Sequence, residues 1–216
     1  MKEPTFTLLL GGSLTMTDRV RQAVKGTRVI AADGGMRHAE ALGVIPELWV
    51  GDFDSSASGL LEHWRKVERQ PYPPQKAATD GEIAVSVALE RGARGLRLLG
   101  ALGGERSDHA LQHFMQAVQL AGAGIETHLS SGAEEAWPLL PGRLDLDLPS
   151  GSLFSVVGLT ELAGLSIDGA RYPLRDFNLP FGSSRTISNV AEGPVRLTLR
   201  SGQGMLLARP YDLTGA

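Results

Sequence analysis

The chain has 216 residues, of which 42% are hydrophobic and 21% charged, and its formal net charge is −3. This composition predicts one or two globular domains with enough apolar side chains to form a core. No block of like charges occurs, which argues against a nucleic-acid partner. Cysteine is absent, so disulfides, thiolate zinc sites and cysteine nucleophiles are excluded.

No segment has the features of a secretory leader or a membrane span. The apolar run near the N-terminus, residues 6–10, is shorter than the apolar part of a signal peptide. No apolar stretch approaches the ~20 residues that cross a bilayer. We therefore expect a soluble, cytoplasmic protein that has no membrane partner.

Up to about residue 129, short apolar runs alternate with helix-like stretches, which is typical of a parallel α/β sheet. The sequence predicts strands at residues 6–10, 28–32, 48–50, 96–99 and 125–129. It predicts helices at residues 18–24, 36–42, 60–66, 80–91 and 108–120. The Pro-rich segment 71–74 is predicted to be a loop.

After residue 129 the helical periodicity ends. Short apolar runs recur between Gly and Pro residues, at 144–148, 153–157, 165–167, 195–199 and 205–208. Such spacing is typical of an antiparallel sandwich or barrel. The predicted fold class is therefore α/β, with an N-terminal parallel-sheet domain over residues 1–129 and a smaller C-terminal all-β domain over residues 130–216.

Three loops that contain glycines and acids each follow a predicted strand. They are Asp33-Gly34-Gly35, Gly51-Asp52-Phe53-Asp54-Ser55 and the glycine-rich segment 100–107. In an open parallel sheet, ligands bind beyond the carboxyl ends of the strands. We therefore expect the three loops to open onto one edge, where their glycines can bring backbone N–H groups close to phosphate.

Asp52 and Asp54 are candidate magnesium ligands. Residues two apart in an extended segment face the same side, so both carboxylates are expected to point one way. At ~4 Å two like charges repel by about 4 kcal/mol at an effective dielectric of 20, and a hard divalent cation relieves that repulsion. Alone, the segment is equally typical of a solvated turn. Its position after a strand, with Asp33 and Asp80 in equivalent positions, favours the metal site.

Thr79 and Asp80 lie at the clearest helix start of the chain. Thr79-Asp80-Gly81-Glu82 has the spacing of a capping box, with an acid in the first turn. Capping is the simpler interpretation. A helix N-terminus also attracts anions, so the same residues can serve phosphate and metal together.

The segment Arg106-Ser107-Asp108-His109 also opens a helix. In the structural interpretation, Ser107 or Asp108 is the N-cap and Arg106 is solvated. In the functional interpretation, Arg106 binds a phosphate, while Asp108 and His109 place the nucleotide or a metal-bound water.

Other motifs carry less information. Gly11-Gly12-Ser13 follows the first predicted strand, but no dinucleotide-binding or Walker-type glycine motif accompanies it. The remaining histidines have no metal-ligand spacing, and we expect them to be structural or surface residues; they are His38, His63, His113 and His128.

Taken in order, these segments resemble the thiamine pyrophosphokinase family, and the resemblance covers nearly the whole chain. In the first domain the matching segments are Asp33-Gly34-Gly35, residues 46–55, Lys76 with Thr79-Asp80, residues 100–104, and Arg106 to His109. In the second domain, Gly169-Ala170-Arg171-Tyr172-Pro173-Leu174 and Ile187-Ser188-Asn189 resemble the signatures of the family's β-domain.

The resemblance implies a Mg²⁺-dependent enzyme that moves the diphosphoryl group of ATP onto thiamine. It implies a homodimer with a Rossmann-like catalytic domain and a β-sandwich domain. Asp52, Asp54 and Asp80 match the family's catalytic and metal-binding acids. Ser188 and Asn189 match the segment that helps to form the thiamine pocket, across the dimer interface. The nucleotide-binding positions would be Asp33, Gly34, Gly35, Lys76, Thr79, Gly103, Gly104, Arg106, Asp108 and His109.

The sequence departs from the family pattern at three places. Ala77 and Ala78 replace an acid and a lysine, Glu105 is an extra residue in its loop, and His113 replaces a common Asn. Two alternatives therefore stay open: a diphosphokinase for another acceptor, such as a hydroxymethylpterin, and a nucleotide-binding regulatory module with weak catalysis. Nor does the sequence decide whether Trp137, Tyr172 or Phe181 stacks on the substrate.

Overall fold

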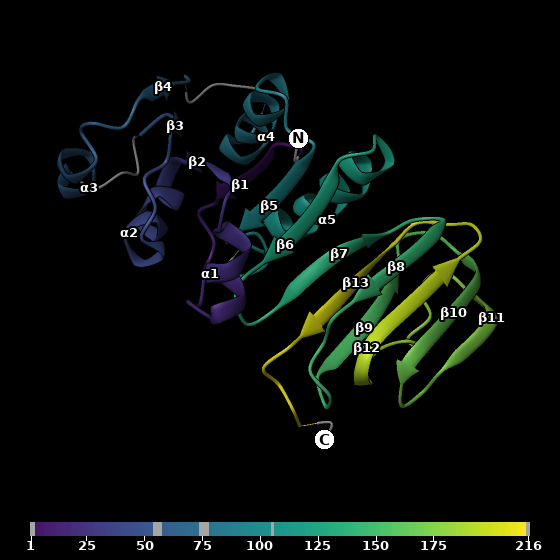
Figure 1. Cartoon of the computed structure of the whole chain (residues 1–216). Helices are drawn as coiled ribbons and strands as arrows, with labels where there is room; N and C mark the ends of the chain where they lie inside the picture. The colour runs from purple at the N-terminus through teal and green to yellow at the C-terminus, as the bar shows by residue number, and fades with distance from the viewer. Residues whose placement is uncertain (1–2, 54–57, 74–77, 105, 215–216) are drawn as a thin grey trace. The chain divides into compact units, whose positions relative to one another are not determined.

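The apolar runs of the first part of the chain form a parallel sheet in the computed structural model, which describes residues 3–53, 58–73, 78–104 and 106–214. Its strand order is β4-β3-β2-β1-β5-β6 (Figure 1). The chain order reverses between β1 and β5, so their carboxyl ends form the topological switch point of this sheet. The strands are β1 (Thr5–Leu9), β2 (Arg28–Ala32), β3 (Leu48–Gly51), β4 (Arg69–Pro71), β5 (Gly95–Leu99) and β6 (Glu126–Ser130).

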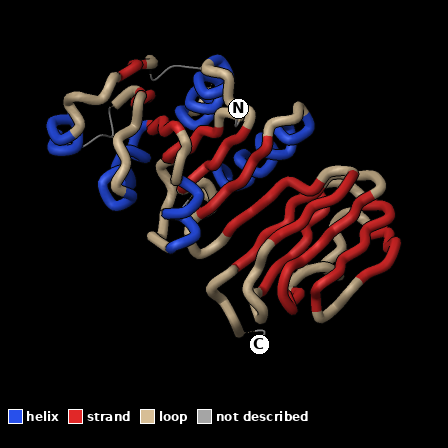
Figure 2. The backbone as a smooth tube through the Cα atoms, viewed as in Figure 1, coloured by secondary structure: helices blue, strands red, loops and turns tan. Residues whose placement is uncertain are grey.

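Helices occur only in the first 122 residues of the described chain (Figure 2). They are α1 (Asp18–Val24), the 3₁₀ helix η1 (Asp33–Arg37), α2 (His38–Leu42), α3 (Ser58–His63), α4 (Asp80–Glu90) and α5 (Ser107–Gly122). The helix predicted at 36–42 is divided in two: the 3₁₀ helix η1 follows β2 directly and covers residues 33–37, and α2 begins only at His38. None of the described helices is long and apolar enough to cross a membrane.

One apolar core of this sheet lies on the face that carries Leu9, Ala31, Trp49 and Leu99, all of them fully buried. These residues come from four neighbouring strands at matching register positions. Met36 and residues of α1 pack against the same face. Burial of side chains such as Leu9 and Leu99 contributes about 1.5–3 kcal/mol each, which stabilises the strands that carry the candidate loops.

After Ser130, the described residues up to 214 form seven more strands, and all their assigned pairings are antiparallel. Their order is β11-β10-β12-β9-β13-β7, with β8 beside β12. They are β7 (Glu135–Leu139), β8 (Gly142–Leu146), β9 (Leu153–Gly158), β10 (Leu162–Ala170), β11 (Leu174–Leu179), β12 (Asn189–Leu199) and β13 (Gly204–Arg209). Alternate residues of β10 and β12, such as Leu165, Ile167 and Leu197, enter a second apolar core.

The chain is therefore a mixed α/β protein with two compact units. The first unit comprises Met1–Ala110 and Gly124–Gly132, and the second comprises Leu111–Ala123 and Ala133–Ala216. Each has its own apolar core.

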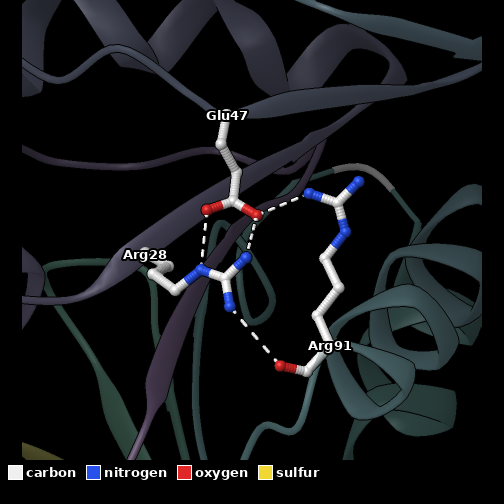
Figure 3. Close-up of polar contacts among 3 residues, drawn as sticks. All are labelled: Arg28, Glu47 and Arg91. Carbon is white, nitrogen blue, oxygen red and sulfur yellow. Dashed lines mark hydrogen bonds and ion pairs between the residues drawn. The ribbon is translucent and has the colours of Figure 1, made fainter.

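A three-residue ion cluster joins elements at the amino edge of the parallel sheet (Figure 3). Glu47, which precedes β3, accepts two hydrogen bonds from Arg28 (2.8 and 2.7 Å) and one from Arg91 (2.6 Å). Burial would raise the pKa of Glu47, but the hydrogen bonds from the two arginines outweigh it and hold the pKa below its ordinary value. The cluster ties β2, β3 and the end of α4 together.

Candidate active site

The carboxyl ends of β2 and β3 bring Asp33 and Asp52 onto neighbouring loops. Asp33 opens η1 with a φ of 40°, and its carbonyl accepts a 2.9 Å hydrogen bond from the indole Nε1 of Trp49. Gly51, the last residue of β3, is so close that an added Cβ would lie 3.1 Å from the Cα of Asp33. The backbone of Asp33 is thus fixed beside the start of the Asp52 loop, and both acids are half-buried.

The chain does not stay extended through the Gly-Asp-Phe-Asp-Ser segment. β3 ends at Gly51, and Phe53 has a left-handed φ of 63°. The Phe53 ring packs edge-on against Trp49, with 5.1 Å between the ring centroids. The expectation of an extended backbone from residue 52 to residue 54 is therefore wrong, because strand alternation is interrupted at Phe53. Asp54 itself lies outside the described residues, as does Lys76.

Asp80 lies at the same edge of the sheet as these acids. At the other end of α4, Arg91 pairs with Glu47 at the amino edge of the strands. Helix α4 has 11 residues and packs along β1, β2 and β3, and a helix of that length spans about 16 Å. Its first residue, Asp80, is therefore carried to the carboxyl edge, where the Asp33 and Asp52 loops lie.

The predicted capping box at the start of α4 is confirmed. The hydroxyl of Thr79 accepts a hydrogen bond from the Glu82 N–H at 3.2 Å, and the Glu82 carboxylate accepts one from the Thr79 N–H at 3.3 Å. Thr79 is exposed and Asp80 half-buried. The first turn therefore combines a hydroxyl and a carboxylate with the positive end of the helix dipole.

The loop after β5, which contains Gly103 and Gly104, is bonded to the loop after β1. The N–H of Gly12 donates to the carbonyl of Gly100 (3.1 Å), and the N–H of Ser13 donates to that of Gly103 (3.2 Å). Gly104 has a φ of 124°, a conformation that side-chain-bearing residues rarely adopt. Gly11-Gly12-Ser13, which matches no glycine motif in the sequence, therefore contacts the loop after β5 at the topological switch point.

The glycines after β2 serve packing as well as loop shape. A Cβ on Gly35 would lie 2.0 Å from the carbonyl oxygen of Leu9, so glycine is what lets η1 approach β1. The carbonyl of Gly34 accepts a hydrogen bond from Arg37 at 3.2 Å. His38, expected to be structural, is 7% exposed and donates from Nε2 to the Gly12 carbonyl at 2.9 Å. No periodicity or motif spacing in the sequence indicates a role for Arg37.

Arg106 and Asp108 form a bidentate ion pair at the start of α5, with N–O distances of 2.9 and 2.7 Å. The hydrogen bonds from Arg106 lower the pKa of Asp108 to about 2. Both side chains are about two-thirds exposed. The N–H of His109 also donates to Asp108, at 3.1 Å. At the end of the loop after β5, the guanidinium of Arg106 is therefore exposed and held in place by the carboxylate of Asp108.

In the second unit, Ser188 and Asn189 lie at the start of β12. Ser188 is exposed with a φ of 59°, while Asn189 is 5% exposed. Asn189 lines a cavity of about 160 Å³ together with Tyr172, Arg185 and Ile187. The two ring-bearing residues of this region, Tyr172 and Phe181, are 62% and 72% exposed, whereas Trp137 packs against the core of the unit.

The acids at the sheet edge fit a magnesium ion by their chemistry. Asp33, Asp52 and Asp80 offer hard carboxylate oxygens, the ligands Mg²⁺ prefers together with phosphate and water. Among residues 3–53, 58–73, 78–104 and 106–214, no group of three or more His, Asp or Glu side chains lies close enough together to hold a metal ion. Asp54, one of the predicted metal-binding acids, is outside the described part of the chain.

Comparison with known proteins gives matches over most of the chain. The model "Thiamin pyrophosphokinase, catalytic domain" matches residues 21–129, and "Thiamin pyrophosphokinase, vitamin B1 binding domain" matches residues 143–206. A thiamine pyrophosphokinase of Bacillus subtilis is 27% identical over 199 residues, covering 86% of this chain and 88% of that protein.

Solved structures match with the same fold. A thiamine pyrophosphokinase structure from Bacillus subtilis has a TM-score of 0.84 at 22% identity and covers 96% of this chain and 99% of its own. One from Candida albicans has a TM-score of 0.76 at 14% identity, with 95% and 90% covered. With its two family models matched in order, the chain belongs to the thiamin pyrophosphokinase family.

Proposed function

We propose that the protein transfers the β,γ-diphosphoryl group of ATP to the hydroxyethyl oxygen of thiamine, giving thiamine diphosphate and AMP. Membership of the family supports the pair of substrates. The observation that carries the proposal is the arrangement of Asp33, Asp52 and Asp80 at one edge of one parallel sheet, beside a glycine loop. Phosphoryl transfer depends mainly on positioning and charge neutralisation, which such an edge can supply.

We also propose how the chain is organised for this reaction. Residues 1–129 would form a Rossmann-like nucleotide-binding catalytic domain, and residues 130–216 a β-sandwich domain for thiamine binding and dimerisation. The functional protein would be a homodimer in the cytoplasm. The parallel pairing of β1 to β6 and the antiparallel pairing of β7 to β13 support this division.

Asp52, Asp54 and Asp80 are the proposed magnesium-binding and catalytic acids. When bound, Mg²⁺ neutralises charge on the transferred phosphates. The carboxylates would hold the ion, and with it the nucleotide phosphates, in position for attack by the acceptor hydroxyl. In the reaction the thiamine hydroxyl oxygen bonds to the β-phosphorus, the bond between that phosphorus and the oxygen bridging to the α-phosphate breaks, and the hydroxyl proton is released. AMP leaves with the bridging oxygen.

The nucleotide would lie along the loops after β2 and β5 and at the start of α4. Arg106 is proposed to bind a phosphate, oriented by Asp108, because its guanidinium is exposed and already fixed by two hydrogen bonds. In the second unit, Ser188 and Asn189 are proposed to form part of the thiamine site. The remaining proposed nucleotide-binding residues are Asp33, Gly34, Gly35, Lys76, Thr79, Gly103, Gly104 and His109.

One assay tests the proposal and its alternatives: the protein is incubated with ATP, Mg²⁺ and thiamine, and both products are identified. We expect AMP and thiamine diphosphate. ADP in place of AMP would exclude diphosphoryl transfer. AMP formed with a hydroxymethylpterin but not with thiamine would change the acceptor, and ATP binding without turnover of either would support the regulatory module.

A further inference from the structure

The short loop of residues 11–13 occupies the topological switch point of the parallel sheet. Its backbone is held on one side by the loop after β5, through the hydrogen bonds of Gly12 to Gly100 and Ser13 to Gly103. A Cβ at Gly12 would lie 2.3 Å from both of those carbonyl oxygens. The 11–13 loop and the loop after β5 are thus in direct backbone contact.

Arg37 and His38 hold the other side of the same loop. One terminal nitrogen of Arg37, Nη2, donates to the carbonyls of Gly11 and Gly12, the latter at 3.1 Å. Its other terminal nitrogen, Nη1, donates to the carbonyl of Gly34 at 3.2 Å. Nε2 of His38 donates to the Gly12 carbonyl at 2.9 Å. Two consecutive residues at the η1–α2 junction therefore bind the 11–13 loop and link it to the loop after β2.

We infer that Arg37 and His38 are positioning residues for the nucleotide, because they join the two loops that our proposed function assigns to ATP. The loop after β2 carries Asp33, and the loop after β5 carries Gly103. The 11–13 loop is bonded to both, so the separation of the two nucleotide loops depends on these contacts. The inference therefore rests on the proposed function and adds two residues to it.

The chemistry of the two side chains suits this task. A guanidinium is a planar donor with a fixed geometry, and here it binds three converging carbonyl oxygens. Because carbonyl dipoles at this edge would oppose the approach of a polyphosphate, a fixed cation among them also favours the nucleotide. His38 is buried, and burial lowers its pKa. Since a carbonyl can only accept, Nε2 must carry a proton in its contact with Gly12.

The burial of His38 indicates that it positions the loop and does not contact the nucleotide directly. The ring is 7% exposed, so its effect on ATP must pass through the 11–13 loop. Arg37 is exposed and could affect ATP either through the loop or by its charge. Variants of both residues therefore distinguish the two roles: a positioning role predicts weaker ATP binding in both, whereas a direct charge contact predicts it for Arg37 alone.

The test compares five variants for the KM of ATP, the KM of thiamine and the binding of an ATP analogue by calorimetry. H38L removes the donor at similar size, and H38Q restores a donor near the position of Nε2. R37A removes the guanidinium and R37K keeps the charge. R21A is the matched control, since Arg21 also donates to a backbone carbonyl, that of Ala41 at 3.0 Å, and not to one of the 11–13 loop in this contact.

We expect H38L and R37A each to raise the KM of ATP and the analogue dissociation constant about two- to tenfold, the value of one or two hydrogen bonds. The KM of thiamine should stay near that of the wild type, H38Q should recover most of the loss, and R21A should leave both constants unchanged. If R37A weakens ATP binding, R37K binds ATP like the wild type and H38L shows no loss, Arg37 acts by direct charge contact with the nucleotide. That result would overturn the inference. Equal rises for both substrates would also overturn it.

The inference and the proposed function fail in different ways. If the wild-type protein binds the ATP analogue but does not convert thiamine, the proposed function fails, and the analogue titrations of the variants still decide the positioning role. If the wild type is active and all five variants bind the analogue equally, the positioning role fails alone. Should H38L not fold, R37A and R37K decide the matter together: a loss in R37A that R37K does not restore supports the positioning role, and full restoration by R37K overturns it.

Discussion

The side chain of Asn189 is hydrogen-bonded to the backbone of Tyr172 in both directions. Its Oδ1 accepts from the Tyr172 N–H at 3.1 Å, and its Nδ2 donates to the Tyr172 carbonyl at 2.9 Å. The same Oδ1 accepts from the Val190 N–H at 2.8 Å. The amide therefore takes the place of a peptide group in a strand pair and fixes the turn between β10 and β11, while the Tyr172 ring stays exposed.

Asn189→Asp should weaken this turn without changing the size of the side chain. The variant keeps the oxygen that accepts two bonds but replaces the donor to the Tyr172 carbonyl with a second oxygen, so this part-buried carbonyl loses its partner. We expect a loss of about 1–3 kcal/mol in the free energy of unfolding. Urea titration measures the stability, and steady-state kinetics should show a raised KM for thiamine with the KM for ATP unchanged.

Asn178→Asp is the control for this change. Asn178 also bonds to backbone in the second unit, but through Oδ1, which accepts from the Gly164 N–H at 3.0 Å. Aspartate retains that acceptor, and residue 178 is exposed, so stability and kinetics should stay near the wild type. Equal losses in both variants would show that the Nδ2 bond to Tyr172 carries no special weight.

Gly12→Ala and Gly11→Ala should differ sharply although the residues are adjacent. A Cβ at Gly12 would meet two carbonyl oxygens at 2.3 Å, whereas nothing lies within 4 Å of a Cβ at Gly11. Forcing the loops apart should cost about 1–3 kcal/mol in Gly12→Ala, as overpacking does, and weaken ATP-analogue binding. Thermal unfolding and calorimetry measure both. If Gly11→Ala lost as much stability and analogue affinity as Gly12→Ala, the described packing around Gly12 would be contradicted.

Glu47→Gln should destabilise the first unit at neutral pH. The carboxylate is 28% exposed and binds two arginines, so we expect a loss of about 1–2 kcal/mol. Because the folded-state pKa lies below 4.5, this contribution is complete above pH 4.5 and is lost as the pH falls through the lowered pKa. The difference from the wild type, measured by urea unfolding, should narrow below pH 4.5.

Glu62→Gln is the matched control for the ion cluster. Glu62 pairs with Arg65 at 2.8 Å, but their side chains are 72% and 66% exposed. Exposed pairs contribute ~0–1 kcal/mol, so this variant should be close to the wild type at every pH. If the stability of Glu62→Gln depended on pH as that of Glu47→Gln does, the loss in Glu47→Gln would reflect general surface charge and not the ion cluster.

Asp52→Asn and Asp54→Asn should each abolish magnesium-dependent turnover while the fold remains. Removing one charge from a site built to neutralise phosphate should lower kcat by at least about 100-fold. Circular dichroism and thermal unfolding verify the fold, and a magnesium titration tests for restored activity. Glu90→Gln, an exposed acid at the end of α4, should keep full activity. Near-normal turnover of either Asp variant would remove that acid from the proposed site.

Local sequence signals predicted many elements of the fold closely. α1 and β2 have the predicted boundaries, and α4 begins at its capping box. Each signal is local: a capping residue, a β-branched run or a breaking glycine. The edge where the three acid and glycine loops lie also followed from the rule that parallel strands end together.

The elements that the sequence did not predict lack such local signals. β4 has three exposed residues and ends at Pro71 within the predicted loop. β7 contains Pro138, and β11 is interrupted by Asp176, whose φ is 44°. The contacts of Arg37 and His38 depend on the meeting of loops far apart in the sequence, so no window of residues indicates them. The expected extension through residue 53 is also absent: Phe53 has a left-handed φ of 63°, and its ring contacts Trp49, a pairing that no local pattern indicates.

The bonds around the 11–13 loop also set an order for assembly during synthesis. Leu10 donates to Leu99 and Thr15 to Ser131, so the start of the chain has to wait for partners made about 90 to 115 residues later. Such long sequence separations slow folding, because chain entropy is lost before the contacts form. A nascent chain that ends before β5 would leave one side of β1 without its neighbour. We therefore expect nucleotide binding to appear only once β6 has emerged, as the last step in completing the first unit.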